Sequence, residues 1–171
     1  MGISCLKLAL VSGSRDSGKT ACLAALAKLL SAAKVRHGGI ITQAEFQVGR
    51  KCIYNASSAA TGKTRRLLKL SPDGPKVDPR GFAFAARVFS RAAGARVLLA
   101  DEFGPLEASG EGFMPALLRL EGKYAAAAVS VRPSLVKTAA RALPHHSGKI
   151  FLPGEVAPEI MAQRIFNWLL K

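Results

Sequence analysis

The stretch GSRDSGKT at residues 13–20 decides the fold. It matches the pattern G-x-x-x-x-G-K-[ST] at every fixed position. In a loop of this type the backbone N–H groups point inward at phosphate oxygens, which the tolerance of glycine for positive φ permits. We therefore expect a phosphate-binding loop that comprises Gly13, Ser14, Arg15, Asp16, Ser17, Gly18, Lys19, Thr20 and Ala21.

Two side chains of this loop carry specific expectations. Lys19 can reach the β and γ phosphates of a nucleoside triphosphate, while the Thr20 hydroxyl can ligate Mg²⁺. The helix that begins near Gly18 adds the positive end of its dipole to the same anion site. The alternative is a glycine turn that merely starts a helix. A strand before the loop and a helix after it are the context that favours phosphate binding.

The first half of the chain alternates between strand and helix patterns. Residues 5–12 form an apolar run of strand length, and residues 18–33 have apolar residues at helical spacing. GGIITQAEF (38–46) and RKCIYNASS (50–58) are β-prone runs that the intervening Gln47, Val48 and Gly49 join as a hairpin. The segment SPDGPKVDPRG (71–81) is rich in Pro, Gly and Asp, so we expect a loop there.

The second half continues the alternation. Helices are expected at residues 82–94, 112–121, 133–143 and 157–170, and strands at residues 96–100, 124–131 and 149–152. This order predicts an α/β fold with a mostly parallel sheet flanked by helices on both faces. Because 171 residues suffice for one core, we expect residues 1–171 to form a single domain.

An acidic pair follows the apolar run at residues 96–100. Asp101 and Glu102 lie at the carboxyl end of this strand, where open α/β sheets place their ligands. We expect Asp101 to hold Mg²⁺ and Glu102 to deprotonate the attacking water. The alternative is that the pair is the acidic start of a solvated loop.

The composition constrains partners and surroundings. The net charge of +14 predicts attraction to polyanions, and we favour a solvated basic surface over a dedicated nucleic-acid interface because no aromatic residues interleave with the cations. Cys5, Cys22 and Cys52 lack metal-ligand spacing, which favours a reducing cytoplasm. No membrane segment is expected, since the apolar start is too short to span a bilayer. The oligomeric state stays open, with a monomer favoured.

Three segments together resemble a known family, the thermophile-type nucleoside triphosphatases. These segments are SGSRDSGKT, the hairpin region GGIITQAEFQVGRKCIYNASSAATGKTRRL, and DEFGPLEASGEGF. The resemblance implies a three-layer, RecA-like P-loop fold and Mg²⁺-dependent hydrolysis of nucleoside triphosphates (NTPs) with loose base selectivity. It also implies that Gly13, Gly18, Lys19 and Thr20 bind phosphate and metal, that Asp101 assists the metal, and that Glu102 activates water. Glu107 either supports this site or its loop, or is a surface acid.

A general base that directly follows the metal-binding acid is typical of P-loop proteins with a strand inserted between the P-loop strand and the acidic strand. Residues 124–131 are the candidate for that strand. Its carboxyl end would bring Ser130 or Arg132 near the γ-phosphate, where Arg132 could stabilise developing charge. Arg15 competes for this role, and either arginine could instead be a surface charge.

Three classes of function fit these features. The first is a hydrolase that cleaves ATP, GTP and other NTPs to the diphosphate and phosphate. The second is a nucleotide or small-metabolite kinase, which uses the same loop and adds an acceptor pocket. The third is a non-catalytic nucleotide-binding accessory protein, similar to the GTP-binding adaptor of molybdopterin-cofactor synthesis. The DEFGPLE motif favours the hydrolase, and the absence of an Asn-Lys-x-Asp motif argues against a dedicated GTP switch.

Overall fold

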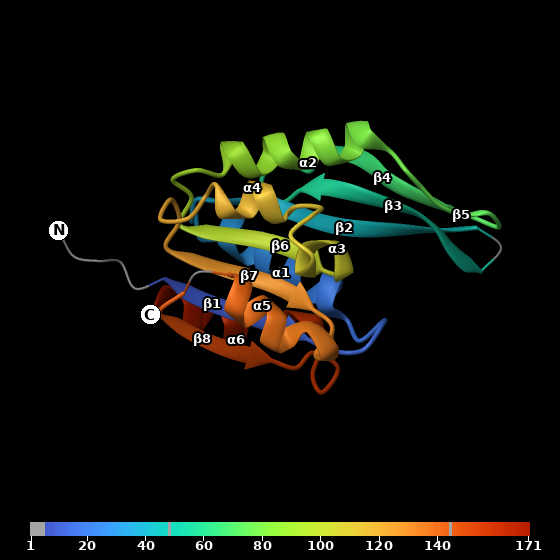
Figure 1. The fold of residues 1–171 in the computed structure, drawn as a ribbon. Helices are drawn as coiled ribbons and strands as arrows, with labels where there is room; N and C mark the ends of the chain where they lie inside the picture. The colour runs from blue at the N-terminus through green and yellow to red at the C-terminus, as the bar shows by residue number, and fades with distance from the viewer. Residues whose placement is uncertain (1–5, 48, 144) are drawn as a thin grey trace.

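The computed structural model describes residues 6–47, 49–143 and 145–171, and within them eight strands form one sheet (Figure 1). The strands are β1 (Lys7–Ser12), β2 (His37–Gln47), β3 (Arg50–Ser58), β4 (Thr64–Ser71), β5 (Gly74–Val77), β6 (Val97–Phe103), β7 (Ala126–Val131) and β8 (Ser147–Phe151). The helices are α1 (Lys19–Ala32), α2 (Pro79–Arg91), α3 (Pro105–Ala108), α4 (Met114–Leu118), α5 (Val136–Ala142) and α6 (Pro158–Leu170), with a short 3₁₀ turn at Pro133–Leu135.

The sheet has the strand order β5-β4-β3-β2-β6-β7-β1-β8. The five strands from β2 to β8 in this order pair in parallel, and β3, β4 and β5 add to the edge as antiparallel strands. The expected hairpin is therefore the β2–β3 pair. Strand β7 lies between β1 and β6, so the insertion of a strand between the loop strand and the acidic strand is confirmed.

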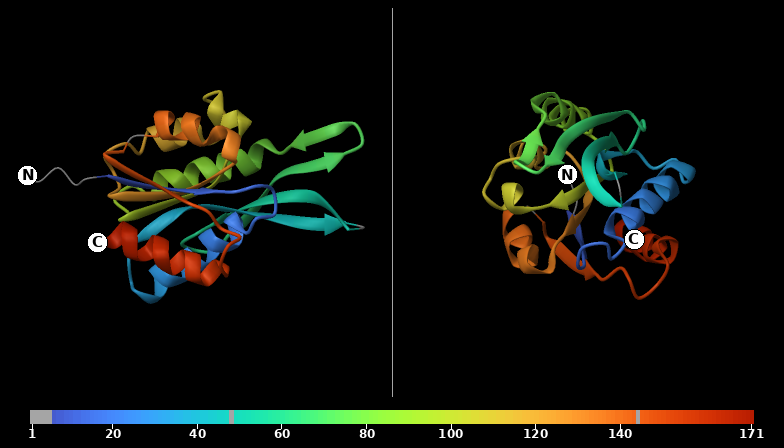
Figure 2. Two further views of the ribbon diagram at one scale, coloured as in Figure 1. Left: turned by 90° about the horizontal axis from the view of Figure 1, so that it is seen from below. Right: turned by 90° about the vertical axis from the view of Figure 1, so that its right-hand side faces the viewer.

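Helices cover both faces of the sheet, as expected for buried parallel strands (Figures 1 and 2). Alternate residues of β1 contribute to two separate cores, one on each face of the sheet. Leu8 and Leu10 point into the core under α2, α4 and α5, while Ala9 and Val11 point into the core under α1 and α6. Strand β7 is buried along its whole length, and its small side chains let helices approach both faces.

Residues 71–81 are not the loop that their composition suggested. Strands β4 and β5 form a second hairpin there, and α2 begins at Pro79. Asp78 caps this helix, because its carboxylate accepts a hydrogen bond from the Arg80 N–H at 3.0 Å. A Gly-Pro pair can be part of a strand here because β5 is an edge strand, where a missing N–H costs no ladder bond.

Two other boundaries differ from the expectations. Strand β6 runs on to Phe103, so the acidic pair lies inside the strand rather than after it. The expected helix at 112–121 is shorter and is preceded by α3, a single turn at Pro105–Ala108. Cys5 and Val48 lie outside the described residues.

The two hairpins project together beyond the body of the molecule (Figure 2, left). They extend from the end of the sheet at which the parallel strands terminate, so the β2–β3 hairpin stands beside the loop after β1. Among the described residues, no helix is both long and apolar enough to cross a membrane.

Candidate functional site

The loop at residues 13–20 connects β1 directly to α1. Gly18 caps the helix with φ 89° and ψ 11°, a left-handed conformation that glycine adopts without strain. Gly13 is needed for a different reason. A Cβ atom there would come within 2.2 Å of the Ser17 Oγ, so a side chain would push the loop open.

Lys19 lies folded along this loop. Its Nζ donates hydrogen bonds to the carbonyl oxygens of Gly13 at 2.8 Å and Ser14 at 2.5 Å. Burial lowers the pKa of its ammonium group, whereas the nearby carboxylates of Asp101 and Glu102 oppose that shift. Lys19 therefore stands within electrostatic reach of both acids from the end of β6.

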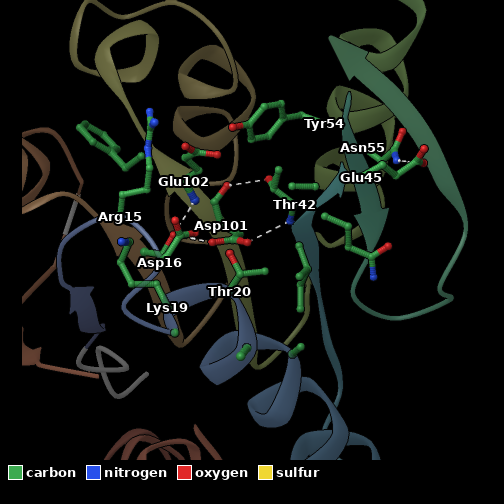
Figure 3. Close-up of a pocket in the computed structure, with 18 of the residues that line it drawn as sticks. Arg15, Asp16, Lys19, Thr20, Thr42, Glu45, Tyr54, Asn55, Asp101 and Glu102 are labelled. Carbon is green, nitrogen blue, oxygen red and sulfur yellow. Dashed lines mark hydrogen bonds between the residues drawn. The ribbon is translucent and has the colours of Figure 1, made fainter. Parts of the chain in front are cut away.

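Asp101 is buried and held from several sides. Its carboxylate accepts hydrogen bonds from the Thr42 N–H at 3.0 Å, from the Ser130 hydroxyl at 2.5 Å, and from the Thr20 side chain (Figure 3). Burial raises the pKa of this carboxyl, and the three hydrogen bonds counteract the rise. The fold thus fixes the orientation of Asp101 beside the hydroxyl of Thr20.

Glu102 lies in a bulge of β6. Pairing between β6 and β7 is interrupted between Ala100 and Phe103, and Glu102 adopts φ 76°. Its N–H donates to the Ser130 Oγ at 2.6 Å, so one hydroxyl contacts both acids. Because bulges re-aim side chains, Glu102 projects outward and is 45% exposed, whereas Asp101 is 2% exposed.

The two candidate arginines both border this site. Arg132 follows β7 and approaches Glu102, with 3.8 Å between its Nη2 and the Glu102 Oε1. Arg15 is exposed on the loop and lines the same cavity. Ser130 also lines the cavity, and its hydroxyl accepts a hydrogen bond from the Glu102 N–H and donates one to the Asp101 carboxylate.

A cavity of about 740 Å³ joins these residues (Figure 3). One wall of the cavity consists of the loop and the start of α1. The floor of the cavity consists of Asp101, Glu102 and the end of β7. The opposite wall comes from the hairpin and the start of β4 and consists of Ile41, Thr42, Gln43, Ala44, Glu45, Phe46, Tyr54, Asn55 and Thr64. The cavity thus reaches from the loop to the projecting strands.

Sequence reasoning missed this hairpin wall and the role of Thr42. Thr42 follows the apolar residues Ile40 and Ile41 in β2, but its N–H meets Asp101 only because β2 pairs with β6. That pairing joins segments 59 residues apart. No local pattern in the sequence marks such a contact.

Glu107 supports a loop and does not enter the cavity. Its carboxylate accepts hydrogen bonds from the N–H groups of Gly104 at 3.0 Å and Phe113 at 3.1 Å. It is 6% exposed, so the interpretation as a surface acid is wrong. Gly112 leaves room for this contact, since a Cβ there would come within 2.1 Å of the Glu107 Oε1.

The oxygen atoms of Thr20 and Asp101 suit a hard cation that takes only some of its ligands from the protein. Among the described residues, no three His, Cys, Asp or Glu side chains gather around a common point. The Thr20 hydroxyl and the Asp101 carboxylate supply neighbouring oxygen atoms instead. Mg²⁺ prefers such oxygens and usually takes its remaining ligands from phosphates and water. The residues present therefore fit Mg²⁺.

The sequence of this chain matches a known protein family. Residues 8–141 match the family described as Protein of unknown function (DUF2478). The chain belongs to the DUF2478 family. The matched range contains the phosphate-loop motif, the hairpin and both acids of β6, so every residue of the site lies within the family's shared region.

This DUF2478 chain is also similar to a named enzyme. Nucleoside-triphosphatase THEP1 of Thermofilum pendens (strain DSM 2475 / Hrk 5) is 29% identical over 121 residues, which cover 64% of this chain. The match spans 65% of the length of that relative. The expected likeness to the thermophile-type nucleoside triphosphatases is thereby confirmed.

Two solved structures share the fold. The solution structure of a human cancer-related nucleoside triphosphatase superposes with a TM-score of 0.72 at 18% identity, over 95% of this chain and 97% of that one. The crystal structure of THEP1 from the hyperthermophile Aquifex aeolicus gives a TM-score of 0.69 at 15% identity, over 96% and 99% of the two chains. The P-loop α/β fold expected for this DUF2478 protein is confirmed.

Proposed function

We propose that this chain is a Mg²⁺-dependent nucleoside triphosphatase that converts ATP, GTP and other NTPs to the diphosphate and phosphate. The observation that carries the proposal is the placement of Asp101 and Glu102. The bulge in β6 separates a buried carboxylate next to Thr20 from an exposed carboxylate that faces the cavity. A general base is needed for hydrolysis and not for nucleotide binding alone.

Each residue has a role in this proposal. The loop N–H groups from Gly13 to Ala21 and the Lys19 ammonium bind the phosphates, and Thr20 and Asp101 hold the metal ion. When bound, Mg²⁺ neutralises charge on the β and γ phosphates. Glu102 accepts a proton from the attacking water.

Arg132 is proposed to stabilise the charge that develops on the γ-phosphoryl group. The distance of 3.8 Å between its Nη2 and the Oε1 of Glu102, the proposed base, supports a place for the guanidinium near the attacking water. Arg15 is on the loop itself, and its exposed side chain forms no ion pair with the described residues. We therefore favour Arg132 over Arg15.

Turnover of ATP, GTP, CTP and UTP with Mg²⁺ tests the assignment. Lys19→Ala is expected to abolish measurable phosphate release, since it removes the charge that reaches the γ-phosphate. Glu102→Gln is expected to slow kcat by about 10²- to 10⁴-fold while nucleotide binding persists. Lys28→Ala and Glu159→Gln remove exposed side chains of α1 and α6 and serve as controls. Normal hydrolysis by Glu102→Gln would show that the base is another group.

Single substitution of the two arginines tests their assignment. Arg132→Ala is expected to lower kcat by about 10³-fold or more, as in P-loop enzymes that lose a charge-stabilising arginine. Arg15→Ala is expected to have the smaller effect, and the measurement is single-turnover hydrolysis with saturating ATP. The reverse order would transfer the role to Arg15.

The surroundings of the protein are proposed on chemical grounds. Cys22 is buried and Cys52 is half-buried, and both carry free thiols, which supports a reducing compartment such as the cytoplasm. Nucleoside triphosphates are the proposed ligands, the protein is proposed to act as a monomer, and a nucleic-acid partner remains the less favoured interpretation of the positive charge.

A further inference from the structure

The cavity lies on the side of the site from which a nucleophile must approach. Glu102 can accept a proton only from a group within hydrogen-bond reach, and its half-exposed carboxylate borders the cavity. In phosphoryl transfer the attacking and leaving oxygens lie roughly in line with phosphorus. The diphosphate therefore leaves on the side of the loop that is opposite Glu102, and the hairpin wall faces the incoming group.

The far side of the loop is bordered by the segment after β8. A Cβ on Gly13 would come within 3.8 Å of the Pro153 ring, and a Cβ on Gly154 within 3.6 Å of the Ser17 carbonyl oxygen. The loop thus separates this segment from the hairpin cavity. A nucleoside on the leaving diphosphate would extend toward Pro153 and leave the hairpin wall uncovered.

The cavity extends from the phosphate-binding loop, where the triphosphate must lie, to the hairpin wall. Its volume is about 740 Å³. A water molecule occupies about 30 Å³ in the liquid, whereas pockets for small organic ligands hold about 300–1,000 Å³. Even with the phosphates in place along the loop, the hairpin side has room for a second molecule in the line of attack.

The hairpin wall offers specific chemistry. Asn55 is 8% exposed, and its Nδ2 donates to the Glu45 Oε1 at 2.5 Å, which fixes the amide in one orientation. The second Glu45 oxygen and the Asn55 Oδ1 accept no hydrogen bond from the described residues, so this pair presents acceptors to a ligand.

An aromatic ring and further polar groups complete the wall. Figure 3 shows the Tyr54 ring directed from β3 toward the side of the cavity where Glu102 lies. Gln43 adds a carboxamide, and the Thr64 hydroxyl is held at 2.8 Å from the Ser57 hydroxyl. A flat ring that stacks and bears hydrogen-bond donors matches this set. A second phosphate is disfavoured because Glu45 is acidic.

We propose that the hairpin wall binds a neutral, hydroxyl-bearing ring compound of the nucleoside class, and that the γ-phosphoryl group is transferred to its hydroxyl. This proposal rests on the proposed triphosphatase site and adds a second substrate to it. The acceptor hydroxyl oxygen forms a bond to γ-phosphorus while the bond from γ-phosphorus to the bridging oxygen breaks. The hydroxyl proton passes to Glu102 and then to solvent. The products are NDP, a phosphate monoester and one proton.

The experiment uses the full chain with MgATP and adenosine, guanosine, cytidine or uridine, and follows products by phosphorus NMR. We expect at least one nucleoside to yield its monophosphate at the expense of free phosphate. Ribose, which lacks the flat ring, is expected to give at least about tenfold less ester at equal concentration. Phosphate release without any nucleoside reports the hydrolase site separately, so a failure there would be recognised as a failure of the proposed function.

Two substitutions locate the acceptor. Glu45→Gln and Asn55→Ala are expected to lower the ratio of transferred to released phosphate by about tenfold or more. Glu159→Gln and Asn167→Ala change exposed residues of α6 and are the matched controls. Glu45→Gln keeps the shape of an exposed side chain, so the test stands even if Asn55→Ala does not fold.

Three outcomes would overturn the proposal. One is that no nucleoside becomes phosphorylated while ATP is hydrolysed. Another is transfer that Glu45→Gln and Asn55→Ala leave unchanged. The third is that both substitutions raise the KM for ATP in the absence of nucleoside, which would assign the hairpin wall to the base of the NTP itself.

Discussion

Asp101 is a carboxylate whose charge the fold must stabilise against burial. Burial alone raises its pKa, and hydrogen bonds from Ser130, Thr20 and Thr42 limit the rise. A buried carboxylate that stays ionised is an effective cation ligand, because no water competes for its oxygens. The same burial is unfavourable for folding when no cation is bound.

The raised pKa of Asp101 predicts how the stability of the fold depends on pH. Because the pKa of Asp101 is higher in the folded chain than in the unfolded chain, the folded chain binds more protons between the two values. The contribution of Asp101 to stability is therefore complete at low pH and is lost as pH rises through the folded pKa. Asp101→Asn removes this titration, so the free energy of unfolding of wild type relative to the variant should fall between about pH 4 and pH 7.

Urea unfolding without Mg²⁺ at both pH values measures that difference. Addition of Mg²⁺ at neutral pH should restore stability to wild type and not to the variant, since binding to the folded state stabilises it. A stability difference that does not change with pH would show that Asp101 does not titrate in this range.

Among the elements, β2 leaves no room for a side chain where Gly39 pairs with β6. Gly39 pairs with Leu99, and its φ is 110°. A Cβ on Gly39 would come within 1.8 Å of the Leu99 carbonyl oxygen. The contact matters for the site because this strand pair also brings the Thr42 N–H to Asp101.

Gly39→Ala should therefore destabilise the chain by about 3 kcal/mol or more, as strain and a backbone clash add together. Gly62→Ala is the matched control, because Gly62 also has positive φ, 71°, but no atom lies within 4 Å of its added Cβ. Its cost is expected to be about 1–2 kcal/mol. The two free energies of unfolding, from urea titrations, should differ clearly, and equal values would refute the close approach.

The elements also show which features can be predicted from sequence. The loop and its flanking strand and helix are local, so the motif and the apolar periodicity specified them. The β5 strand was missed because Gly74 and Pro75 are typical of turns, and only its edge position makes them tolerable. Asp78 and Pro79 do carry a readable helix-start signal, which the loop interpretation overlooked.

On the scale of the whole molecule, the chain carries a net charge of +14, and the proposed ligands are anionic. Such a field speeds the encounter with an anionic ligand, and salt screens it. We expect kcat/KM for MgATP to fall several-fold between about 50 and 300 mM salt, while kcat at saturating ATP stays nearly constant.

The charge is spread over the surface, so no single residue should dominate this effect. Arg87 is exposed on α2, outside the residues that line the cavity. Arg87→Glu should reduce the salt dependence only slightly. A loss of most of the salt dependence in this variant would point to a localised basic site in place of a general field.

The cavity belongs to this scale as well. Its two walls come from α1 and from the β2–β3 hairpin, and they meet only after the sheet has formed. Sequence reasoning predicted the loop, both acids and the arginines that border the cavity. It could not predict Glu45 and Asn55, because a polar pair on a hairpin has no distinguishing pattern until its position is known.

The bulge in β6 has an evolutionary consequence. Two residues, Asp101 and Glu102, stand opposite one residue of β7, and a non-glycine residue is held at positive φ. A chain lacking one of the two could pair β6 with β7 without interruption and would be relieved of strain of about 1–3 kcal/mol. Selection for stability alone would therefore favour loss of the bulge. A descendant that retains the bulge would be expected to still use Glu102 in its function.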